Sequence, residues 1–233
     1  MALPKIQHAI FELEVPSTGK IIRHRLFTVK EEKILLLAQE SKDPKQALLA
    51  MKQVLNNCLI DMNVEDLAMF DLEYLLLSIR GKSVDNKINF TIKDPETAEV
   101  VKLSLDINDV KVSKNSEHSN QIRINEEYVL FLRYPTITEF EKMIENGTPT
   151  AESNYDMMVS CFDKLVSEDS VVKFSDSTDE EIAEFSNDLD SAVITQLKKF
   201  FETMPKLRHE LKYKNSNGKD QIFVIEGMET FFI

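Results

Sequence analysis

Residues 27–83 constrain the fold most, because three helical patterns follow one another there with almost no loop between them. The first pattern begins with the Thr-x-x-Glu spacing of a capping box at Thr28 and Glu31. In this arrangement the threonine oxygen and the glutamate carboxylate each accept a hydrogen bond from a free backbone amide. The segment therefore predicts a rigid helical platform.

The second and third helices of this platform also carry start and stop signals. Asp43 is followed by Pro44, and proline is tolerated at the first helical position, where its missing N–H is harmless. Asn63 is predicted to cap the third helix, and Gly81 to end it. These signals predict three separate helices rather than one long one.

Extended patterns lie on both sides of the platform. The turn residues Pro16 to Gly19 separate two alternating stretches, which predicts an N-terminal β-hairpin. A second hairpin is predicted at the other end of the chain, around Asn215 to Gly218. The predicted strands are His8–Glu14, Lys20–Phe27, Lys87–Lys93, Glu99–Leu105, Val110–Val112, Gln121–Asn125, Tyr128–Tyr134, Arg208–Lys214 and Gln221–Glu226.

A second group of helices is predicted after Pro135, where Thr138 and Glu141 have capping-box spacing. A short apolar piece, Val171–Phe174, lies in an acidic loop within this group. The predicted helices are Glu139–Asn146, Asn154–Val166, Thr178–Leu189 and Ser191–Thr203.

Because helices and strands are segregated rather than alternating, the sequence predicts an α+β fold and not a doubly wound parallel sheet. The expected order is an N-terminal β-hairpin, a three-helix platform, central antiparallel strands, acidic C-terminal helices and a terminal β-hairpin. The expected domains are residues 1–135 and 136–233, or alternatively one continuous domain.

The charge of the chain is unevenly placed. Between Glu139 and Asp190 there are 15 acidic and three basic residues, an excess equal to the net charge of −12 of the whole chain. Such a surface repels phosphate backbones, which argues against nucleic-acid binding. Two interpretations remain open: a solvated helical face, or an acidic surface that docks a basic partner. On the second, Glu180, Glu181 and Glu184 are candidate contact residues.

The sequence contains no recognisable catalytic constellation. The four histidines lie in different segments, and five glycines in the whole chain argue against a glycine-rich phosphate loop. Cys58 and Cys161 lie in apolar patterns and are expected to be buried thiols. No metal, no cofactor, no signal peptide and no membrane span is predicted. The chain is therefore expected not to be an enzyme.

Basic residues gather on the second hairpin strand and the following helix start, with Arg23, Arg25 and Lys30 as candidate partner-binding residues. Internal pairing is the alternative, either locally with Glu31 and Glu32 or with Asp71 and Glu73 on the third helix. We expect these residues to form a structural ion-pair network or a docking face.

The chain ends in Phe231, Phe232 and Ile233. Aromatic side chains at a chain end either fill the domain's own core or anchor a protein interface. Both readings stay open, and the three residues are candidate partner contacts.

Four short segments in combination resemble the T4-like bacteriophage baseplate protein family: Pro16–Lys20, Phe27–Lys33, Phe70–Leu75 and Ile79–Val84. The segment Ile225–Phe232 is similar too. The resemblance implies no catalytic residues. It implies a viral protein of the baseplate hub, made in the host bacterial cytoplasm, that helps to build the tail baseplate or remains in the virion.

The leading hypothesis is therefore a non-enzymatic baseplate-hub protein, a chaperone or structural component that binds other phage tail proteins. Two alternatives remain: a hydrolase with a dispersed carboxylate and histidine site, and a generic cytoplasmic adaptor. The sequence does not indicate an oligomeric state.

Overall fold

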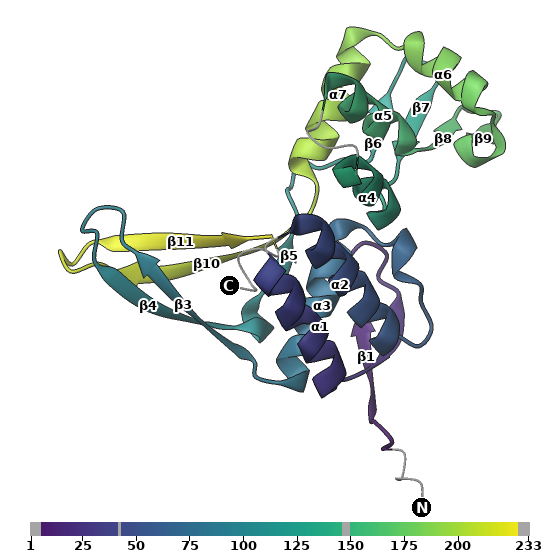
Figure 1. Ribbon diagram of the computed structural model, residues 1–233. Coiled ribbons are helices and arrows are strands. Elements are labelled where there is room, and N and C mark those ends of the chain that lie inside the picture. The colour runs from purple at the N-terminus through teal and green to yellow at the C-terminus, as the bar shows by residue number, and fades with distance from the viewer. Residues whose placement is uncertain (1–5, 42, 146–149, 228–233) are drawn as a thin grey trace, which may run out of the picture. The chain divides into compact units, whose positions relative to one another are not determined.

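The computed structural model describes residues 6–41, 43–145 and 150–227. The chain forms two compact units: unit 1 consists of residues 1–113 and 206–233, and unit 2 of residues 114–205 (Figure 1). Helices and antiparallel strands are segregated along the chain, which confirms the predicted α+β class. The division expected after residue 135 does not coincide with these units, because it falls inside unit 2.

Unit 2 is inserted between two paired strands of unit 1. Strand β5 (Lys111–Ser113) precedes the insertion and β10 (Lys206–Lys214) follows it. The two strands are antiparallel, and Ser113 is the register partner of Lys206. The chain therefore leaves and re-enters unit 1 at neighbouring positions of one sheet.

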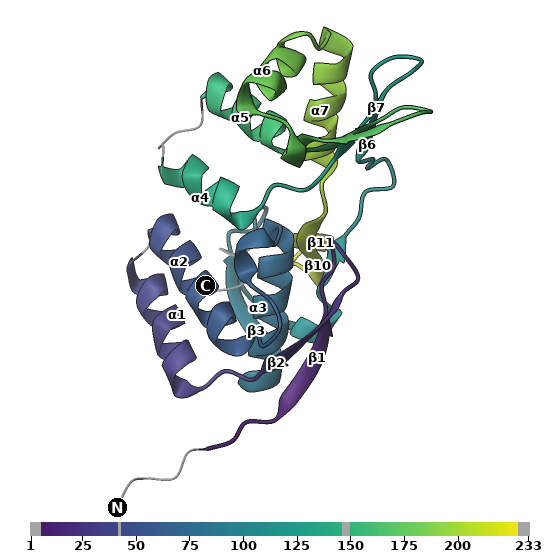
Figure 2. The same ribbon diagram turned by 90° about the vertical axis from the view of Figure 1, so that its right-hand side faces the viewer.

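The predicted N-terminal hairpin and helical platform are present in unit 1, and Figure 2 shows the hairpin alongside α3. Asp43 caps α2 by accepting from the Lys45 amide at 3.0 Å, as its spacing predicts. The elements are β1 (Ile10–Glu14), β2 (Ile21–Arg25), α1 (Val29–Ser41), α2 (Pro44–Cys58), the 3-10 helix η1 (Val64–Asp66) and α3 (Met69–Ser83).

The third helix differs from the prediction at both ends. Asn63 caps η1 rather than α3, since its side chain accepts from the Glu65 amide. Gly81 lies inside α3, where a Cβ atom would stand 2.9 Å from Cγ2 of Ile107. The glycine thus permits close packing of the helix instead of ending it.

The remaining strands of unit 1 form two hairpins, which lie along one another in Figure 1. Strands β3 (Lys87–Lys93) and β4 (Val100–Asp106) make one, and β10 with β11 (Asp220–Glu226) makes the other. The Tyr213 hydroxyl donates to Oδ2 of Asp94 at 2.8 Å and so joins them near their tips. Their shared core contains Leu77, Ile88, Phe90, Leu105, Ile107, Leu207 and Ile225.

Unit 2 is a four-stranded antiparallel sheet in the order β6-β7-β8-β9, with helices packed on one face (Figure 2). Its core includes Ile122, Leu130 and Leu132 from the sheet and Val193, Leu197 and Phe200 from α7. The elements are β6 (Gln121–Arg123), β7 (Val129–Leu132), α4 (Ile137–Glu145), α5 (Ala151–Ser160), β8 (Phe162–Val166), β9 (Val171–Lys173), the 3-10 helix η3 (Phe174–Asp176), α6 (Asp179–Asn187) and α7 (Ser191–Thr203).

Three predictions for unit 2 were wrong in detail. The helix predicted over Asn154–Val166 ends at Ser160, and its last five residues form β8. Part of the predicted acidic loop, Val171–Lys173, is strand β9. The capping box of α4 lies two residues before the predicted one, at Thr136 and Glu139, whose side chains each accept the other's backbone amide.

Candidate partner-binding surfaces

The predicted basic group divides into residues with different environments. Arg23 forms an exposed bidentate pair with Asp61, with contacts of 2.6 and 2.8 Å. Lys30 is exposed in the first turn of α1. Arg25 instead points inward, so the three side chains do not form one basic surface.

Arg25 pairs with the fully buried Glu31 through two contacts of 2.9 and 3.1 Å. The Glu31 carboxylate also accepts from the Thr28 amide and hydroxyl and from Asn57. Burial acts to raise the pKa of Glu31, but the bonds from Arg25 and Thr28 outweigh it and lower the pKa to about 2. Arg25 thus compensates a buried charge.

Of the internal pairings expected for the basic group, the local one with Glu31 is confirmed, whereas the one with Asp71 was wrong. Asp71 is buried, and its Oδ1 accepts a hydrogen bond of 2.9 Å from the Ser17 amide in the hairpin turn. Arg23 and Arg25 find Asp61 and Glu31 instead. Both arginines therefore pair within the chain, with acids from the loop after α2 and from α1.

The net negative charge of the chain lies almost entirely in one structural unit. Unit 2 holds 19 acidic and eight basic residues, so it carries a net charge of −11 of the chain's −12. Glu181 is used locally, because its carboxylate accepts from the Thr178 amide and completes the capping box of α6. Glu180 and Glu184 are exposed on the same helix, without an ion pair to any described residue.

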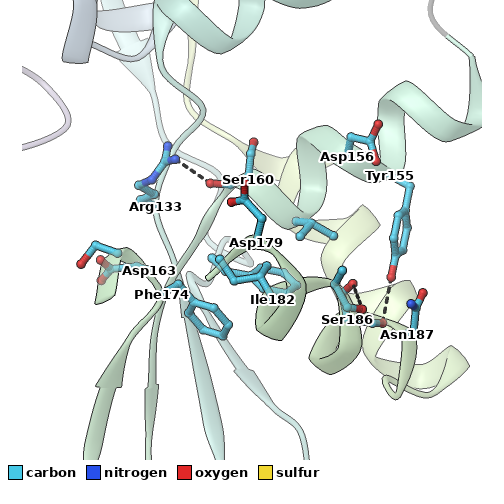
Figure 3. Close-up of a pocket in the computed structure, with 14 residues that line it drawn as sticks. Arg133, Tyr155, Asp156, Ser160, Asp163, Phe174, Asp179, Ile182, Ser186 and Asn187 are labelled. Atoms are coloured by element: carbon cyan, nitrogen blue, oxygen red, sulfur yellow. Dashed lines mark hydrogen bonds between the residues drawn. The ribbon is translucent and has the colours of Figure 1, made fainter. Parts of the chain in front are cut away.

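A pocket of about 870 Å³ lies within unit 2, between α5, α6 and the start of β8 (Figure 3). Apolar side chains supply much of its lining: Val159, Phe162, Phe174, Ile182 and Ala183. The Phe162 and Phe174 rings contact edge to face, with centroids 5.2 Å apart. The pocket therefore offers a lipophilic surface next to solvent.

Three aspartates from three elements border this pocket: Asp156 of α5, Asp163 of β8 and Asp179 of α6. The register of β7 with β8 shifts between Phe131 and Leu132, which leaves Asp163 as an extra residue in a β-bulge. Bulges re-aim side chains, and they are frequent beside binding sites. All three aspartates are exposed.

Polar contacts fix the walls of the pocket. The Tyr155 hydroxyl donates to the Ser186 carbonyl at 2.8 Å and joins α5 to α6. Arg133 donates to the Ser160 carbonyl and pairs with Glu139 at 2.6 Å. The charge of Arg133 is therefore balanced by a neighbour outside the pocket lining.

Sequence reasoning did not find this pocket. Its Asp163 was assigned to a helix, because the bulge interrupts the two-residue alternation that would have revealed β8. The acidic helix α6 was recognised, but its apolar side chains facing the pocket were not.

The candidate residues Phe231, Phe232 and Ile233 lie outside the described residues. Within the described ranges, no group of three or more His, Cys, Asp or Glu is placed to hold a metal ion. No helix there is long and apolar enough to cross a membrane. Cys58 and Cys161 are buried as predicted.

Comparison with known families shows what this chain is similar to. A family model described as "T4 bacteriophage base plate protein" matches residues 8–233. The chain belongs to the T4 bacteriophage base plate protein family. No curated protein and no solved structure was found to match it. Membership confirms the resemblance seen in the sequence and argues against an adaptor outside any phage.

The segments that resemble this baseplate family converge on α3. The Ser17 amide of the first segment bonds Asp71 of the third, and the Phe27 amide of the second bonds the Ser83 hydroxyl of the fourth at 2.9 Å. A Cβ atom on Gly227, in the C-terminal segment, would lie 3.8 Å from Oε1 of Glu73. Two hydrogen bonds thus join the first and second segments to α3, and Gly227 of the C-terminal segment lies beside Glu73 of the same helix.

Proposed function

We propose that this baseplate protein acts without catalysis in assembly of the baseplate hub, as a chaperone or structural component that binds other tail proteins. The observation that carries the proposal is the concentration of net charge in unit 2, a separate compact unit. A charged unit of this kind favours recognition of an oppositely charged surface, through steering and selectivity.

Two features support a role without catalysis. The pocket of unit 2 gathers three aspartates, but no histidine is among its lining residues, so it lacks the pair expected for the alternative hydrolase. Burial raises the pKa of Cys58 to about 11 and that of Cys161 to about 12, which keeps both thiols protonated near neutral pH.

The proposed contact surface is the exposed side of α6, with Glu180 and Glu184 facing a basic partner. Glu181 has a smaller part, because its carboxylate caps its own helix. Arg23 and Lys30 remain secondary candidates in unit 1, whereas Arg25 is committed to Glu31.

Co-expression with the other hub proteins and a pull-down at low and moderate salt tests this function. We expect at least one tail protein to co-purify and to be lost as salt rises, because screening weakens interactions between exposed charges. Replacing Glu180 and Glu184 with lysine is expected to abolish the association.

The matched control carries the same charge change on the β8–β9 turn, at Glu168 and Asp169, and is expected to retain its partner. Failure of every tail protein to co-purify with the native chain at low salt would contradict the proposal.

Analysis of purified particles separates the two forms of the proposal. A structural hub component remains in the virion tail, whereas a chaperone acts in the host cytoplasm and is absent from finished particles. Mass spectrometry of purified phage detects the difference.

A further inference from the structure

The pocket of unit 2 combines an apolar lining with an acidic border. Val159, Phe174 and Ile182 are half-buried and line it together with Phe162. Asp156 and Asp179 stand on the two helices that form its walls, and neither has an ion pair to a described residue (Figure 3). The site thus presents hydrophobic surface and uncompensated negative charge to the same occupant.

From this geometry we infer that the pocket binds an arginine side chain of a partner protein, within a segment that carries apolar neighbours. The inference rests on the proposed function, since it specifies the chemistry that unit 2 recognises.

An arginine fits both parts of the pocket. Its aliphatic stem packs on apolar and aromatic surface, and its planar guanidinium donates paired hydrogen bonds to carboxylates. Aromatic faces such as Phe174 also attract a guanidinium. Arginine is accordingly enriched among the residues that anchor protein interfaces.

Charge argues against the opposite class of ligand. The unit carries a net charge of −11, from 19 acidic and eight basic residues, and therefore repels anions. Arg133 does not reverse this, because it is paired with Glu139. A neutral apolar ligand would fill the pocket but would give the carboxylates of Asp156 and Asp179 no cation to pair with.

Two synthetic peptides test the inference on the full-length protein. One is acetyl-Gly-Leu-Arg-Leu-Gly-amide, and the other has citrulline in place of arginine, which keeps the shape and removes the charge. Binding is followed by chemical-shift changes of labelled backbone amides. We expect the arginine peptide to shift the amides of α5 and α6 and to bind about tenfold more tightly than the citrulline peptide.

Variants then locate the interaction. Asp156→Asn combined with Asp179→Asn is expected to abolish the preference for arginine. Glu180→Gln combined with Glu184→Gln removes the same charge outside the pocket lining and is expected to preserve it. Ala183→Phe fills the pocket from an exposed helix position and is expected to weaken both peptides without a change of net charge.

Equal binding of the two peptides, shifts confined to other surfaces, or a preference that survives in the Asp156 and Asp179 variant would each overturn the inference. The pull-down of hub proteins is read separately. If the peptides fail but a hub protein still binds through Glu180 and Glu184, the inference is wrong and the proposed function stands. If the arginine peptide binds but no hub protein does, the inference stands and the proposed function is wrong.

Discussion

The backbone amide of Ser17 donates a 2.9 Å hydrogen bond to Oδ1 of Asp71, across 54 positions of sequence. This bond ties the turn of the N-terminal hairpin to the first turn of α3. Asp71 is fully buried, and its other oxygen, Oδ2, has no partner among the described residues. The hairpin is thus held to the platform by a buried carboxyl group, and only one of its two oxygens has a hydrogen-bond donor in the part of the chain that the structure describes.

The protonation of Asp71 should make the stability of unit 1 depend on pH. Burial raises the pKa of Asp71 above 3.8, although the hydrogen bonds from Ser17 and Ala68 oppose that shift. The native carboxyl therefore holds its proton to higher pH than the unfolded one. Its contribution to the free energy of unfolding falls as the pH rises from 3.8 through the native pKa.

Asp71→Asn keeps the acceptor for Ser17 and removes the charge. We expect the free energy of unfolding of this variant, minus that of the native protein, to grow as the pH rises from about 4 to about 7. Urea denaturation at several pH values measures it. A difference independent of pH would show that Asp71 is not a buried titrating group.

Glu31 should show the opposite dependence. Its pKa is lowered from 4.5 to about 2, so its stabilising contribution is present above 4.5 and is lost as the pH falls toward 2. Glu31→Gln leaves Arg25 without its carboxylate partner and should cost about 3 kcal/mol at neutral pH.

Glu40→Gln is the matched control for Glu31, because it removes an exposed carboxylate from the same helix. Its effect should stay within about 0.5 kcal/mol. Equal effects of the two substitutions would refute the structural role of the Arg25–Glu31 pair.

Gly81 allows a test of packing between α3 and η2 (Ile107–Asp109). Alanine normally stabilises a helix interior over glycine by about 1 kcal/mol. Here its Cβ would lie 2.9 Å from Cγ2 of Ile107, so we expect Gly81→Ala to destabilise by about 1–3 kcal/mol.

A double-mutant cycle with Ile107→Ala checks this explanation of Gly81. The Ile107 substitution should cost about 1 kcal/mol less in the Gly81→Ala background, because it relieves the contact. Additive effects would mean that the two residues do not meet.

Several helix starts and hairpin turns that depend on a few consecutive residues were predicted correctly from the sequence. Asp43 and Pro44 start α2 as predicted, α7 has the predicted bounds Ser191–Thr203, and the terminal hairpin turns at Asn215 to Gly218. In each case the side chain that decides the structure lies within a few positions of the backbone that it bonds.

Errors arose where a residue outside the local motif makes the choice. Thr136 and Thr138 both stand three residues before a glutamate, and the structure uses the first pair, whose Glu139 also bonds Arg133. The bulge at Asp163 likewise depends on pairing with β7. The pocket could not be predicted, because its walls come from elements that only the tertiary structure brings together.

The chain end provides a further prediction. If Phe231, Phe232 and Ile233 bind a partner, their deletion should leave the melting temperature unchanged and abolish association with hub proteins. A lower melting temperature by several degrees, measured by calorimetry, would instead place them in the core of unit 1.

The insertion of unit 2 predicts that the two units fold separately. Replacing residues 114–205 with Asn-Gly should join Ser113 to Lys206 as a tight hairpin, because these residues are already register partners. We expect the shortened protein to unfold cooperatively and residues 114–205 to do so alone. Loss of cooperative unfolding in both pieces would contradict this.

The same connection sets an order of events during synthesis. Strand β10 pairs with both β5 and β11 and brings Leu207 into the core of unit 1, yet the ribosome makes it only after all of unit 2. Synthesis of residues 114–205 is therefore finished while unit 1 still lacks its last hairpin. Translation through β11 is thus a condition for a finished unit 1, and a chain that stops before Lys206 lacks the strand that closes its sheet.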